Sequence, residues 1–142
     1  MFFSLAAQIG ALFAISICAF AFWKGGATER TFAGSYVLAW LASLVVQLQA
    51  TPSVFPWALF AIDCVLLIVY IALCWRRSTW VVWATALQAL AVASHAMNRF
   101  VVSPTTDAFY TVLNITQYGT LLALGIGTFW VWQENRIASQ DR

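Results

Sequence analysis

The sequence predicts an all-α integral membrane protein, a bundle of five transmembrane helices with the N-terminus outside the cell and the C-terminus in the cytoplasm. The composition, the length of the apolar runs and the charges between these runs lead to this prediction. Hydrophobic residues make up 63% of the 142-residue chain, and charged residues make up only 8%. Because soluble domains carry about 25% charged residues, so few polar side chains would not cover the surface of a soluble fold.

Five apolar runs approach or exceed the length of about 20 residues that a membrane-spanning helix needs. The stretches between them contain charges, glycines or prolines, which are typical of turns. The runs cover residues 3–23, 32–50, 54–75, 79–98 and 108–132, and residues 133–142 are polar. We therefore expect one transmembrane domain, residues 1–132, followed by a short cytoplasmic tail.

The first run is interpreted as a helix that is not cleaved. No lysine or arginine precedes Lys24, so the positively charged start of a signal peptide is missing. Ala6, Gly10, Ala14 and Cys18 recur at every fourth position. Small residues at this spacing let another helix approach closely, so the stripe predicts a packing seam.

The second and third runs contribute the first polar residues inside the predicted spans. Gln47 and Gln49 lie near the end of the second run, and a turn with two prolines follows. Asp63 lies roughly nine residues into the third run, or about 13 Å at 1.5 Å per residue. The basic pair Arg76-Arg77 ends the third run.

The fourth run carries a row of polar side chains toward its end. Gln88, His95 and Arg99 share one face of a helix through their i+7 and i+4 spacing, and Asn98 lies beside this face. The run as a whole is apolar, so these side chains are expected to face the interior of the bundle.

The fifth run places Asn114 and Gln117 at the same depth as the polar residues of the other runs. The pair Gly125-x-Gly127 is interpreted as a site where another helix packs closely, rather than as a ligand-binding loop.

The loop charges determine the predicted orientation. With the N-terminus outside, the cytoplasmic side holds Lys24, Arg30, Arg76, Arg77, Arg136 and Arg142, and the opposite side holds only Arg99. This asymmetry follows the positive-inside rule. Tryptophans at the predicted cytoplasmic ends are typical of an aromatic belt; they are Trp23, Trp75, Trp80, Trp83, Trp130 and Trp132.

Asp63 is the main functional candidate, because an ionisable side chain inside a membrane is costly and marks a functional site by default. The third and fourth runs are antiparallel, so the side chains of Asp63 and His95 lean toward one another. We expect Asp63 to pair with His95 or Arg99. The alternative is a protonated Asp63 that bonds to Gln88 or to a backbone carbonyl.

A wider polar cluster is predicted around this pair. Its members are Asp63, Gln88, His95, Asn98, Arg99, Asn114 and Gln117. Such residues form a proton or ion site, or they act only as hydrogen-bonding groups between helices.

Several function classes are not supported by the sequence. The single histidine, with no glutamate inside the predicted spans, does not provide a metal site with three protein ligands. The three cysteines form no CxxC pair and are interpreted as small buried hydrophobes. No catalytic residue set is recognised, so no enzyme is predicted. A formal net charge of +2 without a basic stripe favours no nucleic-acid partner.

The third and fourth runs resemble an uncharacterised group of small multispanning bacterial membrane proteins. The residues that carry this resemblance, in chain order, are Asp63, Arg76, Arg77, Trp80, Trp83, Gln88 and His95. The resemblance implies a location in the bacterial cytoplasmic (inner) membrane and implies no particular activity.

Three functions stay open. The first is an accessory or structural subunit of an inner-membrane assembly, or a homo-oligomer, whose partners are the lipid bilayer and other subunits or further copies. The second is a small transporter or ion channel with Asp63 as the proton or cation site. The third is a pigment-, haem- or quinone-binding protein with His95 as the ligand, although the sequence requires no cofactor.

Overall fold

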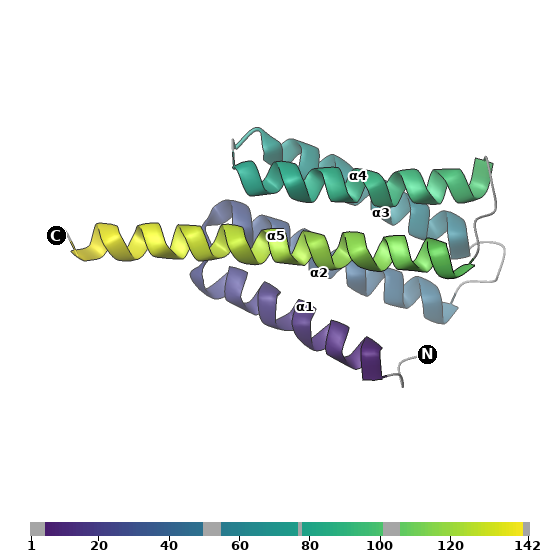
Figure 1. Cartoon of the computed structure of the whole chain (residues 1–142), viewed down its shortest axis with the longest axis horizontal. Coiled ribbons are helices and arrows are strands. Elements are labelled where there is room, and N and C mark those ends of the chain that lie inside the picture. Colours follow the sequence, from purple (N-terminus) through teal and green to yellow (C-terminus); the bar gives the residue numbers. More distant parts are fainter. Residues whose placement is uncertain (1–4, 50–54, 77, 101–105, 141–142) are drawn as a thin grey trace.

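The computed structural model confirms an all-α chain of five helices (Figure 1). It describes residues 5–49, 55–76, 78–100 and 106–140, and side chains for residues 8–49, 57–76, 78–98 and 108–140. The helices are α1 (Leu5–Lys24), α2 (Ala27–Gln49), α3 (Phe55–Cys74), α4 (Thr79–Phe100) and α5 (Thr106–Gln140). The predicted span boundaries at residues 3, 50 and 54 lie outside the described residues.

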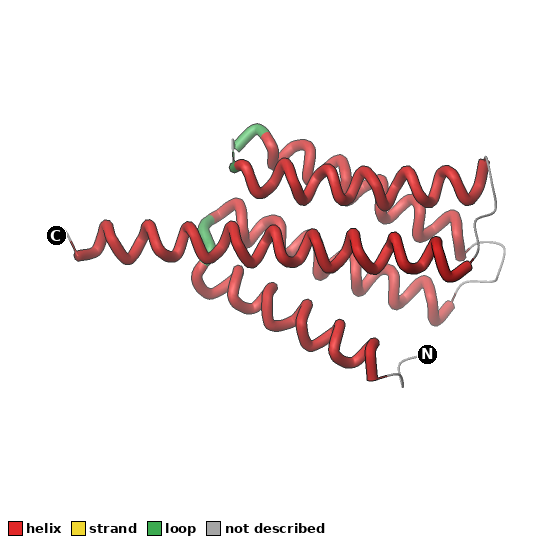
Figure 2. Tube along the Cα trace, viewed as in Figure 1, coloured by secondary structure: helices red, strands yellow, loops and turns green. Residues whose placement is uncertain are grey.

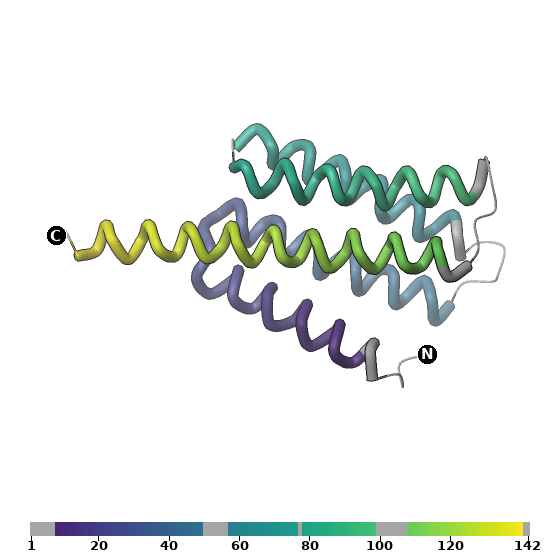
Figure 3. Tube along the Cα trace, viewed as in Figure 1, coloured from purple at the N-terminus to yellow at the C-terminus, as the bar shows by residue number. Residues whose placement is uncertain are grey.

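Successive helices run up and down the bundle, as the colours of Figure 3 trace. The turns from α1 to α2 and from α3 to α4 lie at one end, here called the short-turn end, beyond which the C-terminal part of α5 projects. The N-terminus lies at the other end, here called the open end. The packed pairs are α4 with α5, α3 with α4, α2 with α3, α1 with α5, α1 with α2 and α2 with α5.

The break between α1 and α2 is shorter than the sequence predicts. Helix α2 begins at Ala27 instead of Phe32, so only Gly25 and Gly26 separate it from α1 (Figure 2). The side chain of Glu29 explains the early start, because its Oε2 accepts a hydrogen bond of 3.0 Å from the backbone N–H of Gly26. A carboxylate at the third helical position that binds back to the N-cap residue satisfies a backbone donor and starts the helix.

Helix α5 is longer than the fifth apolar run. It continues through the polar residues 133–140, which are all exposed, and projects beyond the bundle (Figure 1). The predicted cytoplasmic tail is therefore, in its described part, the last turns of this helix.

Among the described residues, three helices are long and apolar enough to cross a membrane, whereas the sequence predicts five. They are Ala27–Gln49, Trp57–Cys74 and Thr79–Asn98. The part of α1 with described side chains, Gln8–Lys24, is a shorter apolar helix. Helix α5 carries two carboxamides and several threonines among its apolar residues, which lower its mean hydropathy. The length and apolar character of the three helices support a multi-pass membrane protein.

The core is tightest near the short-turn end. The ring of Phe32 on α2 stacks on Tyr70 of α3, with 3.9 Å between ring centroids and 13° between ring planes. The indole of Trp80 on α4 meets Phe32 edge-on at 5.0 Å. All three side chains are buried. Trp80 is thus a core residue, and the prediction that it belongs to the aromatic belt at the membrane surface is wrong.

The predicted packing seam of α1 faces the bundle. Ala14 and Cys18 are buried, and Gly10 lies against the hydroxyl of Tyr118; the side chain of Ala6 lies outside the described residues. Two contacts show that α1 and α5 run parallel to one another: Gly10 lies against Tyr118, and Ile17, further along α1, lies against Gly125, further along α5.

The glycine pair of α5 allows two close contacts, as its interpretation predicts. A Cβ atom on Gly125 would lie 3.1 Å from the Cδ1 of Ile17. A Cβ atom on Gly127 would collide with the indole of Trp80, which lies directly on the backbone of α5. A side chain at position 127 would thus push α4 away from α5.

We predict that Gly127→Ala lowers the free energy of unfolding by about 1–3 kcal/mol, because overpacking displaces the buried indole of Trp80. The matched control is Gly34→Ala on α2, where an added Cβ meets only the ring of Phe22 at 3.8 Å. This control is expected to be neutral or stabilising, since alanine is the better helix former. Thermal unfolding in mild detergent measures both, and equal melting temperatures would contradict the close contact.

Candidate functional site

The antiparallel packing of α3 and α4 brings Asp63 close to His95, the only histidine of the chain. Asp63 on α3 and His95 on α4 lie with Oδ2 and Nε2 3.0 Å apart. The contact that the sequence led us to expect between these residues is present. It lies closer to the open end than to the short-turn end, inside two helices that are apolar enough to span a membrane.

Gln88 completes this site from the same helix as His95. Its Nε2 donates to Oδ1 of Asp63 at 2.9 Å and to the backbone carbonyl of Asp63 at 3.3 Å. Each carboxylate oxygen of Asp63 therefore has a partner. The three residues Asp63, Gln88 and His95 are called the Asp63 network below.

Apolar rings surround the imidazole in the Asp63 network. Phe109 of α5 meets His95 edge-on with 5.2 Å between ring centroids, and Phe60 of α3 lies at 6.3 Å. The side chain of His95 is 9% exposed, whereas that of Asp63 is 22% exposed. Because the local dielectric is low among these rings, an ion pair is held more strongly here than in water.

Two further predicted members of the polar cluster, Asn98 and Arg99, follow His95 on α4. Asn98 is half-buried one turn beyond His95. The side chain of Arg99 lies outside the described residues, so its pairing with Asp63 stays a prediction.

The structure places the two predicted members on α5 elsewhere. Asn114 and Gln117 line a cavity between α1, α2 and α5, together with Gln47 of α2. None of the three Asp63 network residues lines this cavity. The polar residues that share one depth in the sequence therefore belong to two separate sites.

The geometry gives little support to His95 as an axial ligand. Its Nε2 faces the carboxylate of Asp63, so a metal at this nitrogen would have to break the pair. Within the described residues, no group of three or more His, Cys, Asp or Glu side chains is placed to hold a metal ion.

Glu29 is a buried acid, although it lies between the first two predicted runs, where the charges and glycines indicate a turn. It is 3% exposed. Its Oε1 accepts a hydrogen bond from the indole N–H of Trp80 at 3.2 Å, while Oε2 accepts the one from Gly26. The sequence signal that identifies it is the spacing of a glutamate three residues after a potential N-cap glycine.

No protein-family model, curated protein or solved structure matches this chain.

We predict that Asp63 and His95 are energetically coupled. Asp63→Ala leaves the buried imidazole of His95 without its partner, so the double variant with His95→Ala should lose less stability than the two single variants added together. The difference should be about 0.5–3 kcal/mol for residues in contact. Unfolding in detergent of the wild type and the three variants measures this coupling.

The control cycle combines Asp63→Ala with Glu134→Ala, an exposed acid on the projecting part of α5. Its energies should add, because the two residues share no partner. Strict additivity in the Asp63–His95 cycle would contradict an energetic role for the pair.

We predict that Glu29→Ala destabilises the bundle by about 1–3 kcal/mol, since it removes the acceptor of two hydrogen bonds and the cap of α2. Glu29→Gln keeps one carbonyl acceptor and should lose less. Glu134→Ala is the matched surface control and should leave the melting temperature unchanged. A Glu29→Ala variant that melts together with this control would show that the buried carboxylate contributes nothing.

Proposed function

We propose that all five helices cross the bacterial cytoplasmic membrane, with the N-terminus outside and the C-terminus inside. Helix α1 packs along the candidate span α2, and α5 packs along the candidate span α4. Helix α1 has 20 residues, which correspond to about 30 Å at 1.5 Å per residue. A helix of this length beside a spanning helix matches the thickness of the hydrocarbon core.

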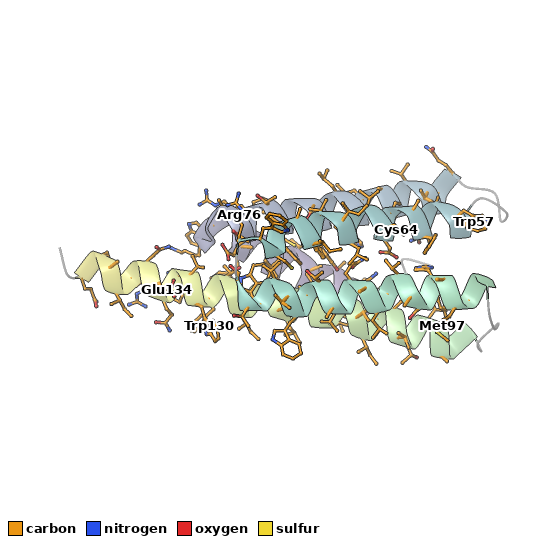
Figure 4. The ribbon with its side chains drawn as sticks, turned by 90° about the horizontal axis from the view of Figure 1, so that it is seen from above. Trp57, Cys64, Arg76, Met97, Trp130 and Glu134 are labelled. Atoms are coloured by element: carbon orange, nitrogen blue, oxygen red, sulfur yellow. The ribbon has the colours of Figure 1, made fainter. Side chains whose placement is uncertain are left out.

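The distribution of charge supports the orientation. Lys24, Arg30 and Arg76 lie at the short-turn end, and Arg136 lies on the projecting part of α5. Figure 4 shows Arg76 toward this end and Glu134 on the projection, with Trp57 and Met97 near the opposite end. A basic end of this kind faces the cytoplasm under the positive-inside rule. Arg77 and Arg142 lie outside the described residues.

Exposed tryptophans support the same placement. Trp23, Trp75, Trp83 and Trp130 are each more than half exposed. Trp23 lies in the last turn of α1, Trp75 directly follows α3, Trp83 lies near the start of α4, and Trp130 lies one turn beyond Gly127, which contacts Trp80 at the short-turn end. Indole rings favour the interface between hydrocarbon and water. The positions of these rings therefore suggest where the inner membrane surface crosses the bundle.

We propose that the protein is a small proton-binding transporter or channel, with Asp63 as the proton site and His95 as its switchable partner. The observation that carries this proposal is the 3.0 Å contact between Asp63 Oδ2 and His95 Nε2 inside two candidate spans. An imidazole gains or loses its charge near physiological pH. Proton relays inside membranes are typically built from paired acidic and histidine side chains.

The chemistry of the pair explains how a proton changes the site. With one proton on the pair, the Asp63 network has no net charge, whether the proton is on Asp63 or on His95 opposite the carboxylate. Without it, the network carries one negative charge in an apolar setting, with only neutral donors from His95 and Gln88. Proton release is thus coupled to the electrostatic attraction between α3 and α4.

An accessory or structural role is the second possibility. Large apolar side chains are exposed on every helix, for example Leu12, Leu38, Val65, Val82 and Ile115. Lipid would cover all of them, and their even distribution favours no single face for a protein partner. We therefore place the accessory role after proton binding.

We predict that the purified chain in proteoliposomes conducts protons down an imposed potential, as measured by an internal pH-sensitive dye. Asp63→Asn should reduce this flux to the level of empty liposomes, because the amide does not take up a proton. The amide keeps the shape of the carboxylate, so the bundle should still fold.

The control is Glu134→Gln, the same change at an exposed acid outside the bundle, which should leave the flux unchanged. Circular dichroism and melting temperature establish that each variant is folded. Wild-type flux equal to that of empty liposomes, or full flux in a folded Asp63→Asn variant, would overturn the proposal.

A further inference from the structure

A cavity of about 300 Å³ lies between α1, α2 and α5, toward the open end. Its lining includes none of the Asp63 network residues. The polar and aromatic side chains that line it are Tyr36, Trp40, Gln47, Asn114, Gln117 and Tyr118. The volume is at the lower limit of sites that hold small organic molecules.

Small residues on α1 create this space. Gly10, Ala11 and Ala14 form the wall that α1 contributes. Figure 1 shows α1 running obliquely to α5, so that in this view the two helices separate toward the N-terminus of α1. The first aromatic contact between them is that of Phe13 with Tyr118, at 6.1 Å between ring centroids. The small side chains and the oblique crossing leave a gap among helices that are otherwise in contact.

The lining selects the chemistry of a ligand. None of the described residues that line the cavity is a lysine, arginine, aspartate or glutamate, and a charge without a partner is strongly disfavoured between membrane helices. Three carboxamides provide N–H donors and carbonyl acceptors. An indole and two phenol rings provide flat apolar surfaces. These groups together suit a neutral planar ring that carries oxygen atoms at its edge.

The size and the location narrow the ligand further. A volume of about 300 Å³ suits one ring with its substituents, whereas a tetrapyrrole is much larger. A ligand that reaches a cavity between membrane helices from the lipid phase must itself be soluble in lipid. Quinones and quinols combine a neutral oxygenated ring with an apolar tail.

We infer that this cavity binds the ring of a lipid-soluble quinone or quinol, with carboxamides of α2 and α5 as hydrogen-bonding partners of the ring oxygens. The ring lies beside Trp40, and the tail extends into the bilayer. This site is independent of proton binding at Asp63.

The test uses decylubiquinone as the probe and the quenching of tryptophan fluorescence as the readout, on the full chain in mild detergent. Trp40 lines the cavity, so binding should quench fluorescence with saturation. Ala11→Leu fills the cavity from α1, and overpacking of this kind should weaken binding about tenfold. Ala19→Leu is the matched control, because Ala19 is an exposed residue of the same helix that does not line the cavity. It should bind like the wild type.

Three further measurements test whether quinone binds in the cavity and whether this binding depends on Asp63. If Ala11→Leu does not fold, the double variant Asn114→Leu and Gln117→Leu replaces two exposed carboxamides and should also weaken binding about tenfold. Decylbenzene has the tail and a ring without oxygens, and it should not compete with the quinone. Asp63→Asn should retain quinone binding, so this inference and the proposed function fail separately.

The inference is overturned by quenching that never saturates, by equal affinity in folded Ala11→Leu and Ala19→Leu, or by equal competition from decylbenzene. The last result would instead identify the cavity as a site for an acyl chain.

Discussion

The indole of Trp80 connects three helices near the short-turn end. Its N–H donates to the buried carboxylate of Glu29 on α2, its ring lies on the backbone of α5 at Gly127, and its edge contact is with Phe32. A buried carboxylate is tolerated only with hydrogen-bonding partners. Because Glu29 also binds Gly26, one side chain both starts α2 and determines where α4 lies. The positions of α2, α4 and α5 therefore depend on one another.

The open end is built differently. There the Asp63 network joins α3 and α4, while small residues of α1 leave a cavity beside α2 and α5. This cavity is open at the surface, and exposed carboxamides and aromatic rings line it. Most of the buried core lies toward the short-turn end, and both candidate sites lie toward the open end.

Much of the fold and part of the site were predictable from the sequence. The apolar runs located all five helices, because a helix satisfies its own backbone and needs only apolar side chains to enter a membrane. The antiparallel order of the third and fourth runs led to the contact of Asp63 with His95. The spacing of Gln88 and His95 placed both on the face of α4 that meets Asp63. The glycine pair of α5 indicated a close helix contact.

Other features depended on the packing. Glu29 lies in a predicted turn and Trp80 in the predicted aromatic belt, and nothing in the sequence indicates that these residues, 51 positions apart, form a buried hydrogen bond. Residues 27–31 are mostly polar, so hydropathy does not predict that α2 begins at Ala27. The hydrogen bond from the backbone N–H of Gly26 to Glu29 makes this start possible. Among the described residues, three helices rather than five are long and apolar enough to span a membrane, because polar residues interrupt the apolar surface of α5 and the described apolar part of α1, Gln8–Lys24, is shorter.

By itself the sequence determined the helices, their alternating direction and the depth of each polar side chain, since these follow from the rise of a helix and the order of the runs. Depth along an axis does not determine which neighbour a side chain faces. Asn114 and Asp63 share a depth, yet the rotation of α5 against α1 and α4 directs Asn114 into the cavity and leaves Asp63 with His95. Only the tertiary structure decided that rotation, because it results from the close contacts of Gly125 with Ile17 and of Gly127 with Trp80.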